Sequence, residues 1–377
     1  MLKLRYTVKD IDIFQQIAYF HRMMKVRDPL KVERQAVDVV SRVLGEIPDI
    51  ARMEIQSTGR DSGVDLLISF DFGGKRRVVA AEVKSSGHPR YVQGALFQLK
   101  RYVMEQHQPI IPVVVAPYLS EEVRALCTES SVGFLDFEGN AHITFPGFYL
   151  SRSVPGKPPA ERRELRSLFK PKSAQVLRAM LREPHRHWRL VQLAEEAVVS
   201  LGHVSNVRNS LIEREWADVS GDGTFLSNPD ALLDAWREAY VPPAGERHSF
   251  YTTLHGMAFE KSLYPAIAPR VDGQVMLASF SAANWLAPYA RTSTHYFYAD
   301  AAGADYLQKA LKLSSAASGE NVVVTVLDDT GLFQDGVKAT PGLPCTSPVQ
   351  TYLDLYVSGE RGREAAEHLR REKMQWM

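Results

Sequence analysis

The pattern of apolar and polar positions predicts a mixed α/β fold over the first 150 residues. Apolar residues recur at helical spacing in three stretches, and two of these open with a proline, which suits a first helical turn. Apolar runs of strand length separate the helices, and the last of them folds back over Glu138-Gly139-Asn140. The expected helices are 29–47, 89–106 and 119–130, and the expected strands lie in 64–72, 77–84, 109–117 and 133–145. This order indicates a mixed sheet flanked by helices.

The middle of the chain has a different pattern. A helix follows Lys170-Pro171, and two short amphipathic helices joined by a turn cover 188–213. A hairpin over Gly221-Asp222-Gly223 comes next. A helix, a helix-turn-helix and a hairpin in this order predict a winged helix. After it, the sequence predicts a strand entering a helix at 273–281, an apolar strand at 321–327 and two helices around a glycine joint at 348–367.

Two stretches have the composition of linkers. Residues 151–159 and 241–247 are poor in apolar residues and rich in proline and glycine. We therefore expect three domains: a mixed α/β domain over 1–150, a winged helix over 165–240 and an α+β domain over 246–377. The length of 377 residues is compatible with this division.

Composition excludes several classes of protein. The 45 basic and 44 acidic residues give a net charge of +1, which excludes a uniformly basic nucleic-acid coat protein. The two cysteines, Cys127 and Cys345, have no metal-ligand or redox spacing, so a disulfide scaffold or zinc finger is excluded. The longest apolar run, 110–116, is too short to span a membrane, and residues 1–5 do not open a signal peptide. We expect a cytoplasmic protein without a membrane partner.

Three charged side chains on the predicted hairpin of 64–84 form a candidate metal site. Glu82 and Lys84 are two residues apart on one strand and therefore share a face. Pairing of the two strands can bring Asp65 beside Glu82. Two carboxylates can hold a hard cation such as Mg²⁺ or Mn²⁺, which would activate a water, while the lysine stabilises charge on a phosphate.

These residues resemble the motif of the PD-(D/E)XK nuclease superfamily, in its branch with a glutamine–tyrosine helix. Gly63-Val64-Asp65, Glu82-Val83-Lys84 and 98–102, which holds Gln98 and Tyr102, carry the resemblance. It implies that Asp65 and Glu82 bind metal, that Lys84 is catalytic, and that Gln98 and Tyr102 support the site. The family often adds an acid from the leading helix, for which Glu33 is the candidate and Glu46 the alternative. Val64 stands where the family name has proline.

The simpler interpretation of Glu82 and Lys84 is an exposed strand with two solvated charges. The neighbouring residues Val78 to Ala81 and Val83 are apolar and favour a largely buried strand instead, where charges need partners or a metal. A nuclease fold can also be retained for binding alone, so catalysis is a separate question.

The predicted second helix of the helix-turn-helix carries side chains suited to reading DNA bases. Asn contacts adenine and Arg contacts guanine in the major groove. Residues 151–190 hold 11 Lys or Arg against 3 Asp or Glu, whereas residues 191–240 hold 3 against 9. Phosphate contacts are therefore expected from the linker and the first helix. The candidate DNA-binding residues are His203, Ser205, Asn206, Arg208 and Asn209 on the recognition helix, with Arg162, Arg163, Lys170 and Lys172 before it. A winged helix used for protein contacts is the alternative.

Together with the winged helix, the C-terminal region resembles the AbiEi family of antitoxin-like transcriptional regulators. The residues that carry this resemblance are 278–283, 345–355 and 359–366. It implies promoter binding by the winged helix and a nucleotidyltransferase toxin encoded in the same operon. The chain departs from the family by its nuclease-like domain. Asp354, between two leucines, is more easily explained by helix packing or partner binding than by catalysis.

Three hypotheses follow. The chain is a DNA-binding regulator of antitoxin type with an accessory nuclease fold, or a Mg²⁺-dependent DNA nuclease that its winged helix targets to double-stranded DNA, or a protein-interaction scaffold. The first two share DNA as a partner and differ on catalysis. The third predicts no salt-dependent DNA binding. A toxin partner and a homodimer on a palindromic site are expected of the regulator.

Overall fold

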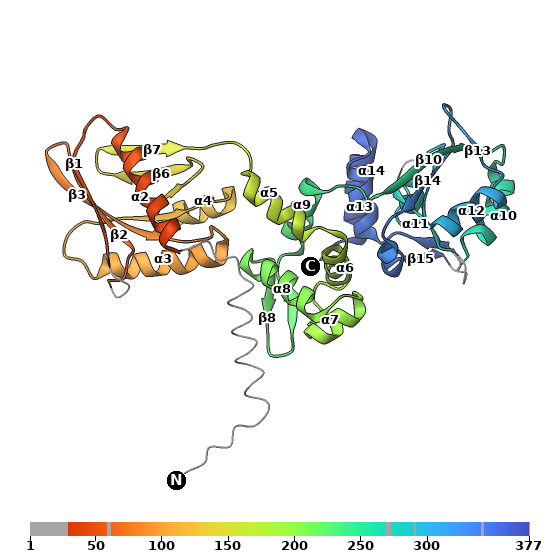
Figure 1. Cartoon of the computed structure of the whole chain (residues 1–377), viewed down its shortest axis with the longest axis horizontal. Coiled ribbons are helices and arrows are strands. Elements are labelled where there is room, and N and C mark those ends of the chain that lie inside the picture. The colour runs from red at the N-terminus through yellow and green to blue at the C-terminus, as the bar shows by residue number, and fades with distance from the viewer. Residues whose placement is uncertain (1–28, 59–61, 269–272, 290–291, 341–342, 377) are drawn as a thin grey trace, which may run out of the picture. The chain divides into compact units, whose positions relative to one another are not determined.

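The computed structural model describes residues 29–58, 62–268, 273–289, 292–340 and 343–376 (Figure 1). The chain divides into two compact units, Met1–Pro158 and Pro159–Met377. Each contains a large mixed sheet with helices, so the mixed α/β class expected from the sequence is confirmed. The division into three domains stays a prediction.

The first unit is built on a seven-stranded sheet in the order β1-β2-β3-β4-β5-β6-β7. The pairs β3–β4 and β4–β5 are parallel, and all other neighbours are antiparallel. Its elements are α2 (Pro29–Gly45), β1 (Ile50–Ser57), β2 (Leu66–Phe72), β3 (Lys75–Val83), α3 (Pro89–Met104), β4 (Ile111–Ala116), α4 (Glu121–Glu129), β5 (Gly133–Asp136), β6 (Ala141–Phe145) and β7 (Phe148–Arg152).

The two faces of this sheet pack against different helices. Val79 and Ala81 of β3 belong to a buried cluster with the apolar stripe of α2. Ala80, between them, belongs to a second cluster with α3 and α4. Because successive side chains of a strand point to opposite faces, α2 covers one face and the α3–α4 pair covers the other. Burial on both faces explains the continuous apolar runs of β3 and β4.

The sequence did not predict the edge strands β1 and β7. Most of their residues are half-buried or exposed, so neither strand carries a clear alternation of apolar and polar positions. β7 also ends at Arg152, inside the segment that was expected to be a linker from residue 151. The central strands were found because burial imposes a pattern on them, whereas an edge strand needs little more than backbone hydrogen bonds.

The second unit begins with the arrangement of a winged helix. Four helices are followed by the two-stranded sheet β8–β9, and Trp188 adds an isolated bridge to Thr224 at its side. The expected helix-turn-helix consists of α7 and α8. The side chain of Ser200 caps the N-terminus of α8. The elements are α5 (Pro159–Leu168), α6 (Pro171–Arg182), α7 (Leu190–Glu196), α8 (Leu201–Glu213), β8 (Ala217–Val219), β9 (Thr224–Leu226) and α9 (Pro229–Ala239).

The rest of the unit holds a second mixed sheet in the order β13-β10-β14-β12-β11-β16-β15. The strand at 321–327, the strand entering a helix at 273–281 and the paired helices near 348–367 are all present, as the sequence predicted. The elements are β10 (Gly245–Tyr251), α10 (Gly256–Ile267), β11 (Val275–Leu277), α11 (Ser279–Leu286), β12 (His295–Ala299), α12 (Ala301–Ala310), β13 (Ser314–Ser315), β14 (Val322–Leu327), the 3-10 helix η1 (Thr330–Asp335), β15 (Val337–Thr340), β16 (Leu343–Cys345), α13 (Pro348–Tyr356) and α14 (Gly359–Lys373).

One buried cluster connects the winged helix to the C-terminal helices. It includes Leu177 on α6 and Trp236 on α9 together with Tyr352 on α13 and Leu369 on α14. β10 starts at Gly245, within the segment 241–247 that was expected to be a linker. A Cβ at Gly245 would lie 2.2 Å from the carbonyl oxygen of Val326. Glycine is therefore needed at this position for β10 to approach β14 closely. Among the described helices, none combines the length and apolar character needed to cross a membrane.

Candidate metal centre and nucleic-acid interface

The pairing of β2 with β3 places Asp65 beside Glu82. Leu66 is opposite Ala81 in the register, so the preceding Asp65 comes opposite Glu82. The Asp65 backbone N–H donates to the Ala81 carbonyl at 3.1 Å, which extends the ladder by one residue. One carboxylate oxygen of Asp65 accepts a hydrogen bond from the Val83 N–H at 2.7 Å. Asp65 is therefore held at the end of the hairpin.

Glu82 is a buried carboxylate with one oxygen satisfied. Glu82 is 4% exposed, and Lys84 Nζ donates a hydrogen bond to its Oε1 at 2.7 Å. Burial raises the pKa of the Glu82 carboxyl, and the nearby Asp65 carboxylate raises it too, while the hydrogen bond from Lys84 opposes the shift. The other oxygen, Oε2, has no hydrogen-bond partner among the described residues. This buried oxygen is suited to accept a cation.

Gln98 and Tyr102, four residues apart on α3, both contact the loop before Asp65. Gln98 Nε2 donates to the Gly63 carbonyl at 3.0 Å. A Cβ at Gly63 would lie 3.2 Å from the Tyr102 ring, and Gly63 has a φ of 83°, which favours glycine. The structure thus brings five predicted residues of the nuclease-like motif together, with the glutamine and tyrosine supporting the chain that carries Asp65.

The leading acid of the motif is not brought to the same place. Glu33 lies on α2, which packs on the opposite face of the sheet from α3. No hydrogen bond or ion pair joins Glu33 to Asp65 or Glu82, all three of which are described. The alternative, Glu46, accepts a hydrogen bond from Arg152 at 2.9 Å on β7. The role of Glu33 stays a prediction.

The residues present fit a magnesium ion with few protein ligands. No cluster of three or more His, Cys, Asp or Glu side chains suited to a metal occurs in the described ranges. Mg²⁺ keeps several waters, however, and is commonly held by one or two carboxylates together with substrate phosphates. Asp65 and Glu82 would hold it, and the unpartnered Oε2 of Glu82 is the observation in favour. Bound there, the ion would polarise a phosphate oxygen and acidify a water.

Two of the five predicted base-reading residues already contact the rest of the winged helix. His203 Nε2 lies 3.0 Å from the buried Ser173 hydroxyl on α6. Arg208 Nε donates to the Thr224 hydroxyl on β9 at 2.8 Å. Asn206 is exposed, and Ser205 and Asn209 are half-buried. Asn206 is therefore the most accessible member of the set for a base.

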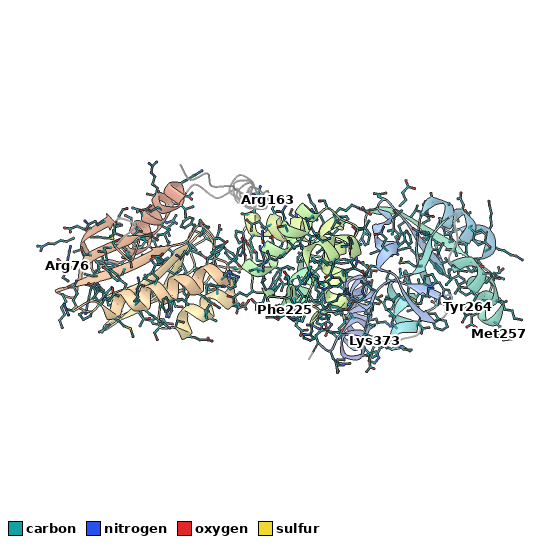
Figure 2. The ribbon with its side chains drawn as sticks, turned by 90° about the horizontal axis from the view of Figure 1, so that it is seen from below. Arg76, Arg163, Phe225, Met257, Tyr264 and Lys373 are labelled. Carbon is teal, nitrogen blue, oxygen red and sulfur yellow. The ribbon has the colours of Figure 1, made fainter. Side chains whose placement is uncertain are left out.

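The basic residues before α8 fall into two groups. Arg162, Arg163, Lys170 and Lys172 are exposed on α5 and at the start of α6, where a phosphate can reach them. Figure 2 shows Arg163 and the β9 residue Phe225 at opposite edges of this part of the molecule. The second group, Arg178 and Arg182, forms ion pairs within the unit.

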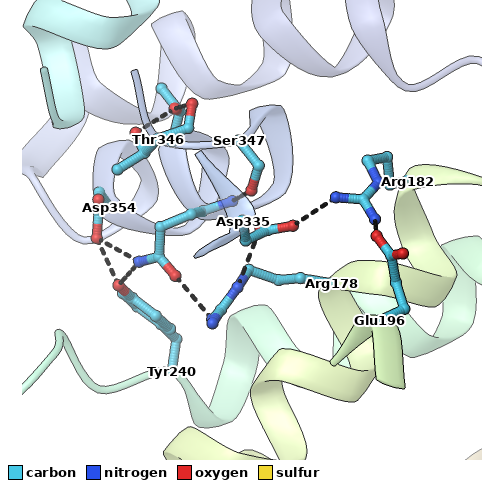
Figure 3. Close-up of polar contacts among 10 residues, drawn as sticks. Arg178, Arg182, Glu196, Tyr240, Asp335, Thr346, Ser347 and Asp354 are labelled. Carbon is cyan, nitrogen blue, oxygen red and sulfur yellow. Dashed lines mark hydrogen bonds and ion pairs between the residues drawn. The ribbon is translucent and has the colours of Figure 1, made fainter. Parts of the chain in front are cut away.

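Arg178 and Arg182 belong to a buried polar network that the sequence did not reveal (Figure 3). Arg178 Nε lies 3.1 Å from Asp335 Oδ2, and its Nη1 donates to Gln350 Oε1 at 3.3 Å. Asp354 Oδ1 accepts hydrogen bonds from Tyr240, Tyr298 and Gln350. The only sequence signal was the position of Arg178 and Asp354 inside apolar helices. The Asp354 side chain thus contacts the C-terminal end of α9 and strand β12 as well as its own helix, consistent with a packing role.

Burial changes the acidity of this network. The pKa of Asp354 is raised to about 6, because desolvation of the carboxylate outweighs the hydrogen bonds that stabilise it. Burial also raises the pKa of Asp335, against the attraction of Arg178. These groups join α6 of the winged helix to α13 and η1. The network is thus a polar junction inside a single unit.

Comparisons with known proteins bear on the second unit. No curated protein and no solved structure matches the chain. Residues 225–375 match the family model of the transcriptional regulator AbiEi antitoxin, of a Type IV toxin–antitoxin system. The match begins in β9 and ends after α14, so the helix-turn-helix and the first unit lie outside it. Over these residues the chain is similar to an antitoxin and transcriptional regulator.

Proposed function

We propose that the chain is a DNA-binding transcriptional regulator of antitoxin type. The observation that carries this proposal is the match of residues 225–375 to such a family: the match begins in the hairpin of the winged helix and continues into helices that share one core with it. The exposed Asn206 on α8 and the exposed basic residues of α5 and α6 supply base and phosphate contacts. A toxin partner encoded nearby and a homodimer on a palindromic site belong to the same proposal.

Fluorescence anisotropy with labelled duplexes tests DNA binding. The duplexes are the DNA upstream of the gene for this chain and the same bases in shuffled order. We expect tighter binding to the upstream sequence, with an affinity that falls steeply as salt rises. Asn206→Ala removes one bidentate base contact, so affinity should fall about 5- to 150-fold for the upstream duplex. Gln308→Ala, an exposed amide on α12, is the matched control.

Two results would contradict the regulator. Equal affinity for both duplexes would remove sequence recognition, and an affinity independent of salt would favour the protein-interaction scaffold. Unchanged binding by the Asn206 variant would place base recognition elsewhere.

A second function, a metal-dependent DNA nuclease, is supported by one specific observation in the first unit. Asp65 and Glu82 lie side by side, Lys84 is paired to Glu82, and Glu82 Oε2 is buried without a partner. Lys84 is placed to stabilise negative charge on a phosphate held between these groups. Gln98 fixes the loop that carries Asp65 and acts as a positioning residue.

Metal binding and cleavage are measured separately to test the nuclease. Thermal unfolding with and without Mg²⁺ or Mn²⁺ should show stabilisation of the wild type and of Glu129→Gln, an exposed control on α4, but not of Glu82→Gln. Cleavage of linear, circular and single-stranded DNA should require the metal and be lost in Lys84→Ala. If neither effect is seen while DNA is still bound, the nuclease is contradicted and only the regulator remains supported.

A further inference from the structure

A cavity of about 320 Å³ opens beside the polar network of the second unit. Its walls come from the end of α5, the first two turns of α6, the end of α9, the segment 241–244 and η1. The volume is within the range of pockets that bind small ligands. The nuclease-like site does not use it, and among the proposed DNA-binding residues only Lys170 lines it.

One buried polar atom in the wall has no partner. Gln175 lines the cavity and is only 6% exposed, yet its Oε1 accepts no hydrogen bond from the described residues. The amide approaches Gly331 closely, since a Cβ at that glycine would lie 1.7 Å from Gln175 Nε2. A buried amide oxygen without a donor costs free energy. A ligand that offers an N–H or O–H here would remove that cost.

The charges around the cavity favour an anion. Arg166 and Lys170 are exposed at its edge and form no ion pair within the described ranges, whereas Arg178, which also lines the cavity, is already paired with Asp335 in the network shown in Figure 3. Asp329 is the opposing charge, and its Oδ1 accepts a hydrogen bond from the Gly331 N–H at 2.8 Å. The N-terminus of α6 adds its positive dipole end, since Lys170 is the N-cap and makes no side-chain cap bond.

The remaining wall is apolar and partly aromatic. Phe169 and Trp236 stack with ring centroids 5.5 Å apart and planes 3° from parallel. Trp236 is only 2% exposed, so the half-buried Phe169 is the ring of this pair that would contact a planar ligand. An anionic group, a planar ring and a hydrogen-bond donor are thus the three features that this cavity would recognise together.

We propose that this cavity binds a nucleoside monophosphate. The phosphate would contact Lys170 and Arg166, the base would lie along the aromatic wall, and an N–H of the base would donate to Gln175 Oε1. Because α6 belongs to the winged helix and Gln350 and Tyr240 also line the cavity, an occupant would bridge the winged helix and α13. The site is distinct from the DNA interface proposed above, although Lys170 is common to both.

Isothermal titration calorimetry on the full chain tests the proposal, with AMP, GMP, CMP and UMP and with inorganic phosphate as probes. We expect at least one nucleotide to bind and phosphate alone to bind far more weakly. Lys170→Ala should weaken nucleotide binding about tenfold, because it removes a charge-assisted contact. Lys172→Ala is the matched control: it is exposed two residues further along and does not line the cavity, so its nucleotide affinity should equal the wild type.

A second variant tests the donor contact. Gln175→Leu should weaken nucleotide binding and leave DNA affinity unchanged, and its thermal unfolding midpoint shows whether it is folded. The proposal is overturned if no nucleotide binds, if phosphate alone binds as tightly as the nucleotides, or if Lys170→Ala and Lys172→Ala behave alike. Loss of DNA affinity in Lys170→Ala without any nucleotide binding would likewise overturn it and assign the lysine to the DNA backbone.

Discussion

At the scale of the residue, two buried carboxylates differ in what surrounds them. Glu82 has a lysine on one oxygen, a second carboxylate nearby and no partner for the other oxygen. Asp354 is surrounded by neutral donors, two tyrosines and a glutamine, with Arg178 further away. The first arrangement leaves a place for a cation. The second satisfies the hydrogen bonds of one oxygen while leaving the charge poorly solvated.

The raised pKa of Asp354 predicts a pH-dependent stability. Because the folded-state pKa is about 6 and the ordinary value is 3.8, the folded chain holds a proton that the unfolded chain has lost between these pH values. The free energy of unfolding should therefore fall, by about 3 kcal/mol in total, as pH rises from about 4 to 6. Thermal unfolding across this range should show a smaller fall in Asp354→Asn than in the wild type, because the raised pKa values of Asp335 and Glu82 contribute to the fall in both proteins. Parallel pH profiles would contradict the assignment.

At the scale of the element, the hairpin of the winged helix depends on a close backbone approach. Trp188 bridges Thr224 of β9, and each backbone N–H donates to the other residue's carbonyl at 2.8 and 2.9 Å. Gly223, next to this bridge, has a φ of 150°, and a Cβ there would lie 2.5 Å from the Trp188 carbonyl oxygen. Gly223 is therefore required because the hairpin packs closely against the backbone that precedes α7.

Gly223→Ala should therefore destabilise the winged helix. A backbone atom cannot move aside as a flexible side chain can, so we expect a loss of about 2 kcal/mol or more in the free energy of unfolding. Gly221→Ala is the matched control in the same turn, since a Cβ there meets nothing within 4 Å, and its effect should stay within about 0.5 kcal/mol. Chemical denaturation measures both. Equal stability of the two variants would show that the turn relaxes freely.

At the scale of the whole molecule, the buried clusters indicate which parts of the chain fold and unfold together. The first unit has its own two clusters, one on each face of its sheet. In the second unit, one cluster spans α6, α9, α13 and α14. Packing therefore joins the winged helix to the C-terminal helices.

Separate expression of fragments tests this organisation. Residues 29–158 and 159–377 should each unfold in a single cooperative transition, because each contains complete clusters. Residues 159–245 alone should be poorly folded, since Leu177 and Trp236 would lose their contacts with Tyr352 and Leu369. Circular dichroism during heating measures all three. A sharp transition for 159–245 would instead support three independent domains.

Much of the candidate site was predictable because its residues are close in sequence or on paired strands. The spacing of Glu82 and Lys84, and the hairpin that sets Asp65 opposite Glu82, follow from local geometry. That Gln98 supports the site followed only from the family resemblance, and its contact with Gly63, 35 residues away, came from the structure. Glu33 shows the limit: its helix could be predicted, but the face of the sheet that the helix covers could not.

The sequence by itself determined the periodic elements, the order of the nuclease-like motif and the plan of the winged helix, because burial and turn chemistry leave local patterns. Tertiary structure alone decided the edge strands, the use of His203 and Arg208 inside the winged helix, and the network of Arg178, Asp335, Gln350 and Asp354. Those contacts join residues as much as 172 positions apart. A charged residue inside an apolar helix indicates that its side chain needs a partner, but only the folded chain determines which residue that partner is.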